Sequence, residues 1–161
     1  MLSRLTRVTM ILATVGLTVA VLAAAQTKDP FVGAWRLNIA KSTFSPGPPP
    51  RSQESTYEAA GQGYKVTVKS EPASGPALQW SFTSDLDGKD APITGNNPNA
   101  DTVALKRIDA HTLESVNKKG GKVTTQQKNV VAADGRTRTV TTTGTDAKGQ
   151  KVNNVAVYEK Q

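Results

Sequence analysis

The fold is decided by the stretch Phe31-Val32-Gly33-Ala34-Trp35-Arg36-Leu37. Apolar side chains at Trp35, Leu37 and Ile39 alternate with polar ones, which is the period of a β-strand with one buried face. The stretch follows a removable export signal within a few residues, so it opens the folded part of the chain. We therefore expect the domain to begin with a strand.

The same alternation recurs along the rest of the chain. Tyr64, Val66 and Val68 share one face of residues 64–69, and residues 78–83 repeat the pattern with larger apolar groups. Further strands are expected at 54–60, 102–108, 112–118, 122–131, 136–143 and 152–159. Residues 26–161 show no helical periodicity.

Turn-forming residues separate nearly all of these segments. The pair Asp134-Gly135 predicts a two-residue hairpin, because glycine accepts the positive φ that such turns demand. Short strands at a spacing of roughly 8–12 residues are typical of an antiparallel sandwich or barrel.

The two halves of the chain differ in a way that favours a barrel. Every aromatic residue except Tyr158 precedes residue 83, and the later strands are rich in Thr, Gln, Asn and Lys. A sandwich needs large apolar residues from every strand, whereas a barrel with a partly wet interior does not. The expected fold is all-β, an antiparallel up-and-down barrel of about 8–10 strands.

Two segments interrupt the strands. Residues 45–50, Ser-Pro-Gly-Pro-Pro-Pro, cannot donate ladder hydrogen bonds and should run extended over the surface as a stiff crossover between the first two strands. A polyproline ligand for a partner is the alternative interpretation. Residues 85–101 read as a long ordered loop with one short strand near Ile93, and loops of that length often border a binding site.

Residues 1–25 have the three zones of a secretory signal peptide. Arg4 and Arg7 give the positive start, residues 8–22 are apolar and uncharged, and Ala23-Ala24-Ala25 offers a cleavage site before Gln26. An uncleaved membrane anchor is the alternative, since the apolar run approaches the roughly 18-residue minimum for spanning a bilayer. We expect cleavage, a single barrel domain over residues 26–161, and a periplasmic or secreted protein without a stable membrane anchor.

The composition excludes several kinds of site and partner. The chain has no cysteine, which excludes a lipid-modified cysteine, disulfides and thiolate metal sites. The formal net charge of +7 becomes +5 when Arg4 and Arg7 leave with the signal. The remaining lysines are spread along the strands without interleaved aromatic residues, so we expect solvated strand faces and no nucleic-acid partner.

The start of the domain resembles a known group. Gly33-Ala34-Trp35 in a first strand resembles the Gly-x-Trp motif of lipocalins and fatty-acid-binding proteins. Residues 29–38, together with 106–109 and 153–158, are similar to small secreted bacterial lipocalin-like (calycin-type) proteins, a group without an established function. The resemblance implies an antiparallel barrel whose lumen holds a small apolar molecule.

The sequence departs from fatty-acid-binding proteins at two places. Those proteins have a helical lid where this chain has its Pro-rich segment. They also end with an Arg-x-Tyr pair that holds the ligand carboxylate, and if Tyr158 is the matching tyrosine, Ala156 occupies the arginine position. A charged ligand end would need another partner, such as Arg138 or Arg107.

The candidate binding residues follow from these patterns. Gly33 and Trp35 are expected to be structural, with Trp35 closing one end of the barrel. Arg107 and Arg138 either face solvent, stack on a buried tryptophan, or point inward to an anionic group. The candidates for lining the lumen are Tyr57, Tyr64, Trp80, Phe82, Arg107, Arg138 and Tyr158.

No set of residues requires catalysis. His111 is the only histidine, in an expected turn, and no Gly-x-Ser-x-Gly elbow or second metal-binding histidine accompanies it. The aspartates near residues 85–101 do not match a calcium-loop pattern. We therefore expect no cofactor, no metal and no enzymatic activity.

Two functional hypotheses remain. The first is an exported, monomeric binding protein that holds a small apolar or amphipathic molecule in the barrel lumen. The second is a structural or interaction protein of the cell envelope, with a filled barrel or sandwich and no ligand. The interior volume discriminates between them.

Overall fold

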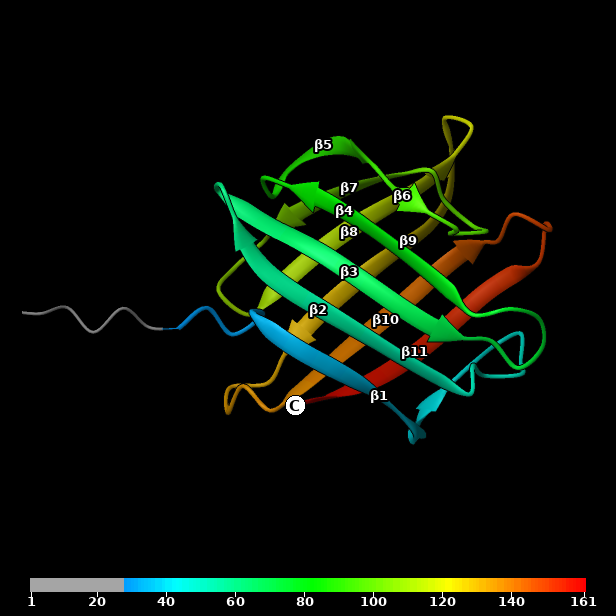
Figure 1. The fold of residues 1–161 in the computed structure, drawn as a ribbon, viewed down its shortest axis with the longest axis horizontal. Coiled ribbons are helices and arrows are strands. Elements are labelled where there is room, and N and C mark those ends of the chain that lie inside the picture. The colour runs from blue at the N-terminus through cyan, green and yellow to red at the C-terminus, as the bar shows by residue number, and fades with distance from the viewer. Residues whose placement is uncertain (1–27) are drawn as a thin grey trace, which may run out of the picture.

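The computed structural model describes residues 28–161, and the predicted signal peptide lies outside this range. Strands make up most of the described chain (Figure 1). They are β1 (Gly33–Thr43), β2 (Ser52–Ala60), β3 (Gly63–Glu71), β4 (Leu78–Ser84), β5 (Asp87–Pro92), β6 (Thr94–Gly95), β7 (Thr102–Arg107), β8 (Thr112–Lys119), β9 (Lys122–Val131), β10 (Thr137–Thr145) and β11 (Lys151–Lys160).

These strands form one antiparallel sheet that curls into a nearly closed barrel. Their order is β5-β7-β8-β9-β10-β11-β1-β2-β3-β4-β6. From β1 to β4 and from β7 to β11 each strand pairs with the next in sequence, β5 pairs with β7, β6 pairs with β4, and the first long strand pairs with the last. No backbone ladder joins β4 to β7 within residues 28–161, although β4 contacts both β5 and β7 across this gap. The expected up-and-down all-β barrel is confirmed.

The segment 85–101 differs from the expectation. It was expected to be a long loop with one short strand near Ile93, but β5 and β6 lie on either side of that residue and bring the strand count to eleven. β5 pairs with β7 from Asp87↔Lys106 to Pro92↔Thr102, although Ala91 is its only buried side chain. A ladder of backbone hydrogen bonds does not need apolar side chains, so the polar sequence concealed a strand.

The turns differ in length from one hairpin to the next. Gly120-Gly121 forms a two-residue turn between β8 and β9, with φ of 55° and 75°, the left-handed values that such turns require. The expected two-residue hairpin at Asp134-Gly135 is wrong, because residues 132–136 separate β9 from β10. The amide of Gly135 donates to the carbonyl of Ala132, which closes a wider turn.

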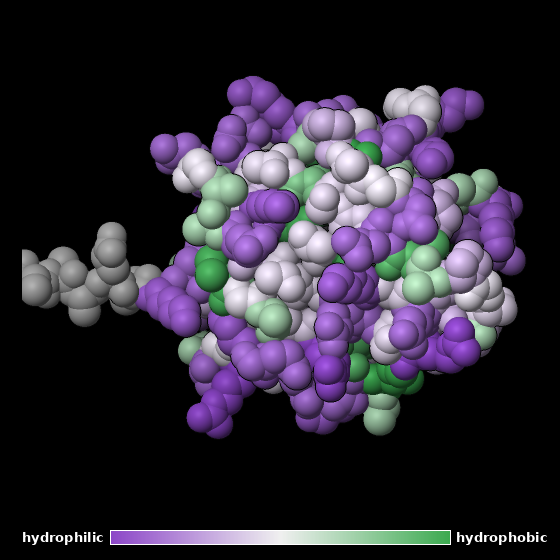
Figure 2. All heavy atoms as spheres, viewed as in Figure 1, coloured by the Kyte–Doolittle hydropathy of each residue, from purple (hydrophilic) through white to green (hydrophobic). Residues whose placement is uncertain are grey.

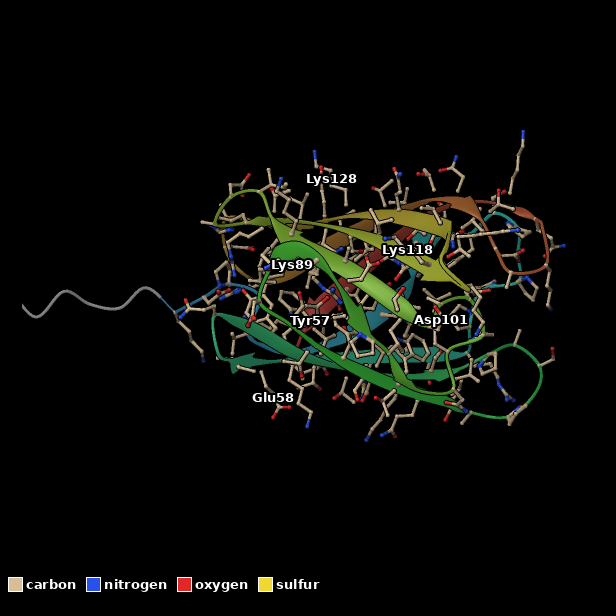
Figure 3. All side chains as sticks on the ribbon, turned by 90° about the horizontal axis from the view of Figure 1, so that it is seen from above. Tyr57, Glu58, Lys89, Asp101, Lys118 and Lys128 are labelled. Carbon is tan, nitrogen blue, oxygen red and sulfur yellow. The ribbon has the colours of Figure 1, made fainter. Side chains whose placement is uncertain are left out.

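The alternation of apolar and polar residues along the strands separates buried from exposed side chains, as expected. In β3, Tyr64, Val66 and Val68 are buried, and Lys65 between them is exposed. Seen from above, the strands form two layers with Tyr57 between them, whereas Glu58 and Lys128 point outward (Figure 3). The face in Figure 2 is mostly polar, with small separate apolar areas. Among residues 28–161, no helix has the length and apolar character needed to cross a membrane.

The Pro-rich segment connects β1 to β2 without forming a strand, as expected for a crossover. Its first residue, Ser45, accepts a hydrogen bond from the amide of Asn153 through its carbonyl and donates its own amide to the side chain of Asn154. These two bonds hold the crossover beside β11, at the barrel end opposite the start of β1 (Figure 1).

Gly144 gives a direct test of the barrel's strand packing. Its φ is 137°, and a Cβ built there would collide with the backbone of Thr124 and Thr125 in β9. Gly144→Ala should therefore lower the free energy of unfolding by about 1–3 kcal/mol, as measured by urea denaturation. The neighbouring exposed variant Thr143→Ala should change the free energy by no more than about 0.5 kcal/mol. Equal stabilities of the two variants would contradict this packing.

Candidate functional site

The barrel encloses a cavity at the end covered by the Pro-rich crossover. This outer cavity has a volume of about 380 Å³. Phe44, Pro46, Pro48 and Pro50 form its rim on one side, and the loop of residues 97–100 forms it on another. Because the rim prolines belong to a mostly exposed segment, this is the open end of the barrel.

A smaller inner cavity of about 120 Å³ continues toward the middle of the barrel. The two cavities share seven lining residues, namely Gln53, Trp80, Asn97, Asn117, Gln127, Val140 and Tyr158. They therefore lie next to each other along the barrel interior. Arg138, Tyr57 and Phe82 line only the inner part.

Two walls of different chemistry face each other across this space. The wall from β3 and β4 is aromatic and aliphatic, with Val66, Val68, Leu78, Trp80 and Phe82. The wall from β8, β9 and β10 carries amides and hydroxyls, among them Ser115, Asn117, Thr125, Gln127, Asn129 and Thr142. Trp80 and Phe82 are only partly buried, as expected for rings that face an open space.

Arg138 lies inside the barrel and is 3% exposed. Its Nη1 donates to the hydroxyl of Tyr57 at 2.8 Å and to Oδ1 of Asn129 at 3.1 Å, and its Nη2 donates to Ser55 Oγ at 2.6 Å. The guanidinium carbon also lies 4.4 Å from the ring centre of Tyr158. Four strands are joined by this one side chain.

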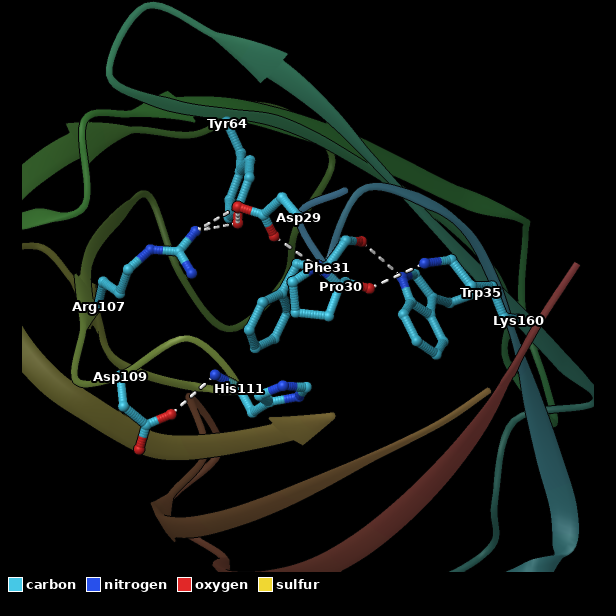
Figure 4. A network of polar contacts seen from close by, with 9 residues as sticks. All are labelled: Asp29, Pro30, Phe31, Trp35, Tyr64, Arg107, Asp109, His111 and Lys160. Carbon is cyan, nitrogen blue, oxygen red and sulfur yellow. Dashed lines mark hydrogen bonds and ion pairs between the residues drawn. The ribbon is translucent and has the colours of Figure 1, made fainter. Parts of the chain in front are cut away.

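The barrel end opposite the crossover is filled. Phe31 and Trp35 are fully buried there, and Trp35 Nε1 donates to the carbonyl of Phe31 at 2.8 Å (Figure 4). Lys160 Nζ lies 4.9 Å from the Trp35 ring centre and donates to the carbonyl of Pro30. Gly33 lies beside the Lys160 side chain at the start of β1. The segment before β1 thus plugs this end.

A polar network completes the filled end. Asp29 Oδ2 accepts from the hydroxyl of Tyr64 at 2.5 Å and from Arg107 Nη2 at 2.8 Å, and Arg107 also contacts the Tyr64 hydroxyl (Figure 4). Burial, and then the hydrogen bond to Asp29, raises the pKa of Tyr64 well above its usual value. The positive charge of Arg107 is already paired with a carboxylate.

The structure brings five of the seven lining candidates together around the cavity. These are Tyr57, Trp80, Phe82, Arg138 and Tyr158. Tyr64 and Arg107 lie instead in the network at the filled end and line neither part of the cavity. Ala156, at the arginine position of the Arg-x-Tyr pair, lines the outer cavity.

Several residues of the site were not predicted from the sequence. Arg138 donates to Asn129 on the neighbouring strand β9 and to Ser55 on β2, and neither short polar residue shows in the sequence which group it will bind. The polar wall had a readable signal, because Thr125, Gln127 and Asn129 alternate along β9 on the same face as buried Val131. The plug residues Asp29 and Phe31 carried no periodic signal, since they precede the first strand.

His111 lies away from the cavity. It occupies the bend between β7 and β8, where its amide donates to Asp109 Oδ1 at 2.7 Å and its Nδ1 lies 3.1 Å from the carbonyl oxygen of Val131. Within residues 28–161, no three His, Asp or Glu side chains gather as a metal site.

Comparisons with known proteins give little beyond this geometry. No family model matches the chain, and the search of curated proteins found no match. Among solved structures, the zebrafish ileal bile acid-binding protein in complex with cholic acid aligns with a TM-score of 0.46 and 13% sequence identity. The alignment covers 82% of this chain and 99% of that one.

Burial of Tyr158 predicts a pH dependence of stability. Desolvation raises its pKa to about 12, against an ordinary value of 10.0, although Arg138 acts in the opposite direction. Between these values the unfolded chain loses the phenolic proton while the folded chain keeps it, so the free energy of unfolding should fall as pH rises through this window.

Chemical denaturation between about pH 9 and pH 12 measures this fall. Lysine titration contributes equally to the wild type and to Tyr158→Phe, so the difference between them isolates the tyrosine. The variant should lose stability less steeply than the wild type. Identical slopes would contradict the burial of the Tyr158 hydroxyl.

Proposed function

We propose that this protein binds a small amphipathic molecule in its barrel. The observation that carries the proposal is the outer cavity, which has a volume of about 380 Å³. Sites for small molecules have volumes of roughly 300–1,000 Å³, whereas packed interiors leave few voids larger than a water molecule. The volume argues against the alternative of an envelope protein with a filled interior.

The chemistry of the two walls supports an amphipathic ligand over a purely apolar one. An apolar group gains from removal of water against Trp80 and Phe82. Asn117 donates to Thr125 and Gln127 accepts from Ser115, but a fully apolar ligand would leave the other donors and acceptors of these two amides without water. A molecule with both apolar and hydrogen-bonding groups satisfies both walls.

The crossover end is the proposed entrance. Its rim is made of prolines and of the loop that contains Pro98, so apolar ring surface surrounds the opening. At the other end, Phe31 and Trp35 leave no passage, because both are fully buried. A ligand therefore enters between the crossover and the loop of residues 97–100.

The role we propose is binding without catalysis. His111, the only histidine, lines neither part of the cavity. The tyrosine hydroxyls of the cavity are neighbours of an arginine but not of a basic group that could take a proton from them.

We further propose that the protein is exported and that the mature chain begins at Gln26. The charged start, the apolar run and the Ala-rich end of residues 1–25 support this. Intact-mass spectrometry of the protein recovered from the periplasm or the medium should give the mass of residues 26–161. Recovery of the full 161-residue chain from the membrane fraction would contradict cleavage.

Trp80→Ala tests the cavity through a neutral probe. The fluorescence of N-phenyl-1-naphthylamine should rise on addition of the wild-type protein, and Trp80→Ala should weaken this binding among folded molecules. Because part of the Trp80 ring already faces open space, the variant should lose less than the roughly 3–5 kcal/mol typical of a fully packed tryptophan.

Tyr64→Ala is the matched control, since it removes a buried aromatic ring outside the cavity. It should lower stability without changing probe affinity in the folded fraction. A full-size stability loss in Trp80→Ala with unchanged probe affinity would overturn the placement of Trp80 in a binding cavity. Absence of any probe binding by the wild type would count against the proposed function.

A further inference from the structure

We propose that the polar part of the ligand is an uncharged group with several hydroxyls, and that a belt of polar side chains inside the barrel binds it. This polar belt consists of Ser115, Gln127, Thr142 and Asn154. The inference rests on the proposed function, because it names the chemical class of the molecule that the same cavity holds.

The polar belt crosses the strands β8 to β11 in one row. Ser115 in β8 is paired with Gln127 in β9, which is paired in turn with Thr142 in β10. Thr142 is also paired with Asn154 in β11. The side chains of residues directly opposite each other in antiparallel strands lie roughly 4.5–5.5 Å apart. The belt therefore offers adjacent hydrogen-bonding groups to one molecule.

Bonds within the protein use only part of the belt. Oε1 of Gln127 accepts from Ser115 at 3.3 Å, and Oδ1 of Asn154 accepts from the amide of Ser45 at 2.9 Å. Nε2 of Gln127, Nδ2 of Asn154 and the hydroxyl of Thr142 have no partner within residues 28–161, and none of the three is fully buried. These groups can donate to hydroxyl oxygens of a ligand, and Thr142 can also accept from one.

The outer cavity has no free counter-ion for a charged ligand. Asp146 is the only charged residue among those that line it in the described part of the chain. Its Oδ1 accepts from the backbone amides of Lys148 and Gln150 at 2.9 and 2.8 Å, so this carboxylate closes the turn between β10 and β11. Burial of an ionised group without a counter-ion is costly, whereas hydroxyls need only hydrogen bonds.

Arg138 lines the inner cavity but is already enclosed. It is 3% exposed, and its guanidinium donates to Tyr57, Asn129 and Ser55. Its Nε is buried, with no open space beside it. An anionic group would have to displace one of these partners, whereas a neutral group at the polar belt leaves them in place.

The wall opposite the polar belt suits an apolar chain. Leu78 and Trp80 line the outer cavity and are only partly buried. Removal of water from these surfaces favours an alkyl group against them. A molecule that joins a polyhydroxylated ring to an alkyl chain, as an alkyl glycoside does, matches both walls.

Three probes with eight-carbon chains test the charge of the polar part. They are octyl β-D-glucoside, octanoate and octyltrimethylammonium, each titrated by calorimetry below its micelle concentration. The wild-type protein should bind the glucoside at least about tenfold more tightly than either ion, because an ionised group finds no counter-ion in the cavity. 1-Octanol, with a single hydroxyl, should bind at least about threefold more weakly than the glucoside.

Two variants and two matched controls locate the hydroxyl-binding groups. Gln127→Leu and Thr142→Val remove belt groups and keep the approximate size of the side chain. Each should weaken glucoside binding by about 3–10-fold and leave the affinity for 1-octanol within about twofold. Gln126→Leu and Thr143→Val make the same changes at exposed neighbours outside the cavity, and should keep the wild-type affinity for both probes.

The outcomes separate this inference from the proposed function. If either ion or 1-octanol binds the wild type as tightly as the glucoside, the inference is overturned and the proposed function stands. Unchanged glucoside affinity in both belt variants, or an equal loss in the controls, also overturns the inference. Binding of none of the four probes overturns both proposals. The comparison of probes on the wild type needs no variant, so it decides the question even if a belt variant fails to fold.

Discussion

The guanidinium of Arg138 lies in the barrel interior against the rings of Trp35, Tyr57 and Tyr158, with hydrogen bonds to Ser55 and Asn129. These partners come from the beginning and the end of the domain, so one side chain connects the first strands to the last. The burial of this charge constrains everything around it. Polar acceptors must reach inward from β2 and β9, and Nε remains buried without a hydrogen-bond partner in the described part of the chain.

One end of the barrel is packed and contributes to stability, and the other end contains the proposed binding cavity. At the end before β1, Phe31 and Trp35 fill the interior, and Lys160 and Asp29 tie the plug to the strands. At the other end the Pro-rich crossover has no side chains large enough to fill the space beneath it, and the cavity stays open. The difference in composition between the two halves of the chain is also a difference between the two walls of the cavity. The aromatic early strands form one wall, and the amide-rich later strands form the wall that faces it.

The barrel, its long strands and some of its cavity residues, such as Trp80 and Phe82, could be predicted from alternation, because every second residue of a half-buried strand faces inward. β5 could not be predicted in this way, because a strand that pairs through its backbone does not need alternating apolar side chains. Alternation placed Tyr64 on an inward face and left the direction of Arg107 open, but it could not say at which end of the barrel they lie. The structure places both beside Asp29 at the filled end. Two partners of Arg138, Ser55 and Tyr57, lie on β2 and are far from it in sequence, and no local pattern contains such contacts.

A crystal structure of the protein grown with saturating octyl β-D-glucoside would test the central claim most directly. We predict electron density for the alkyl chain in the outer cavity, in contact with Leu78 and Trp80. A cavity that holds only water would contradict the account.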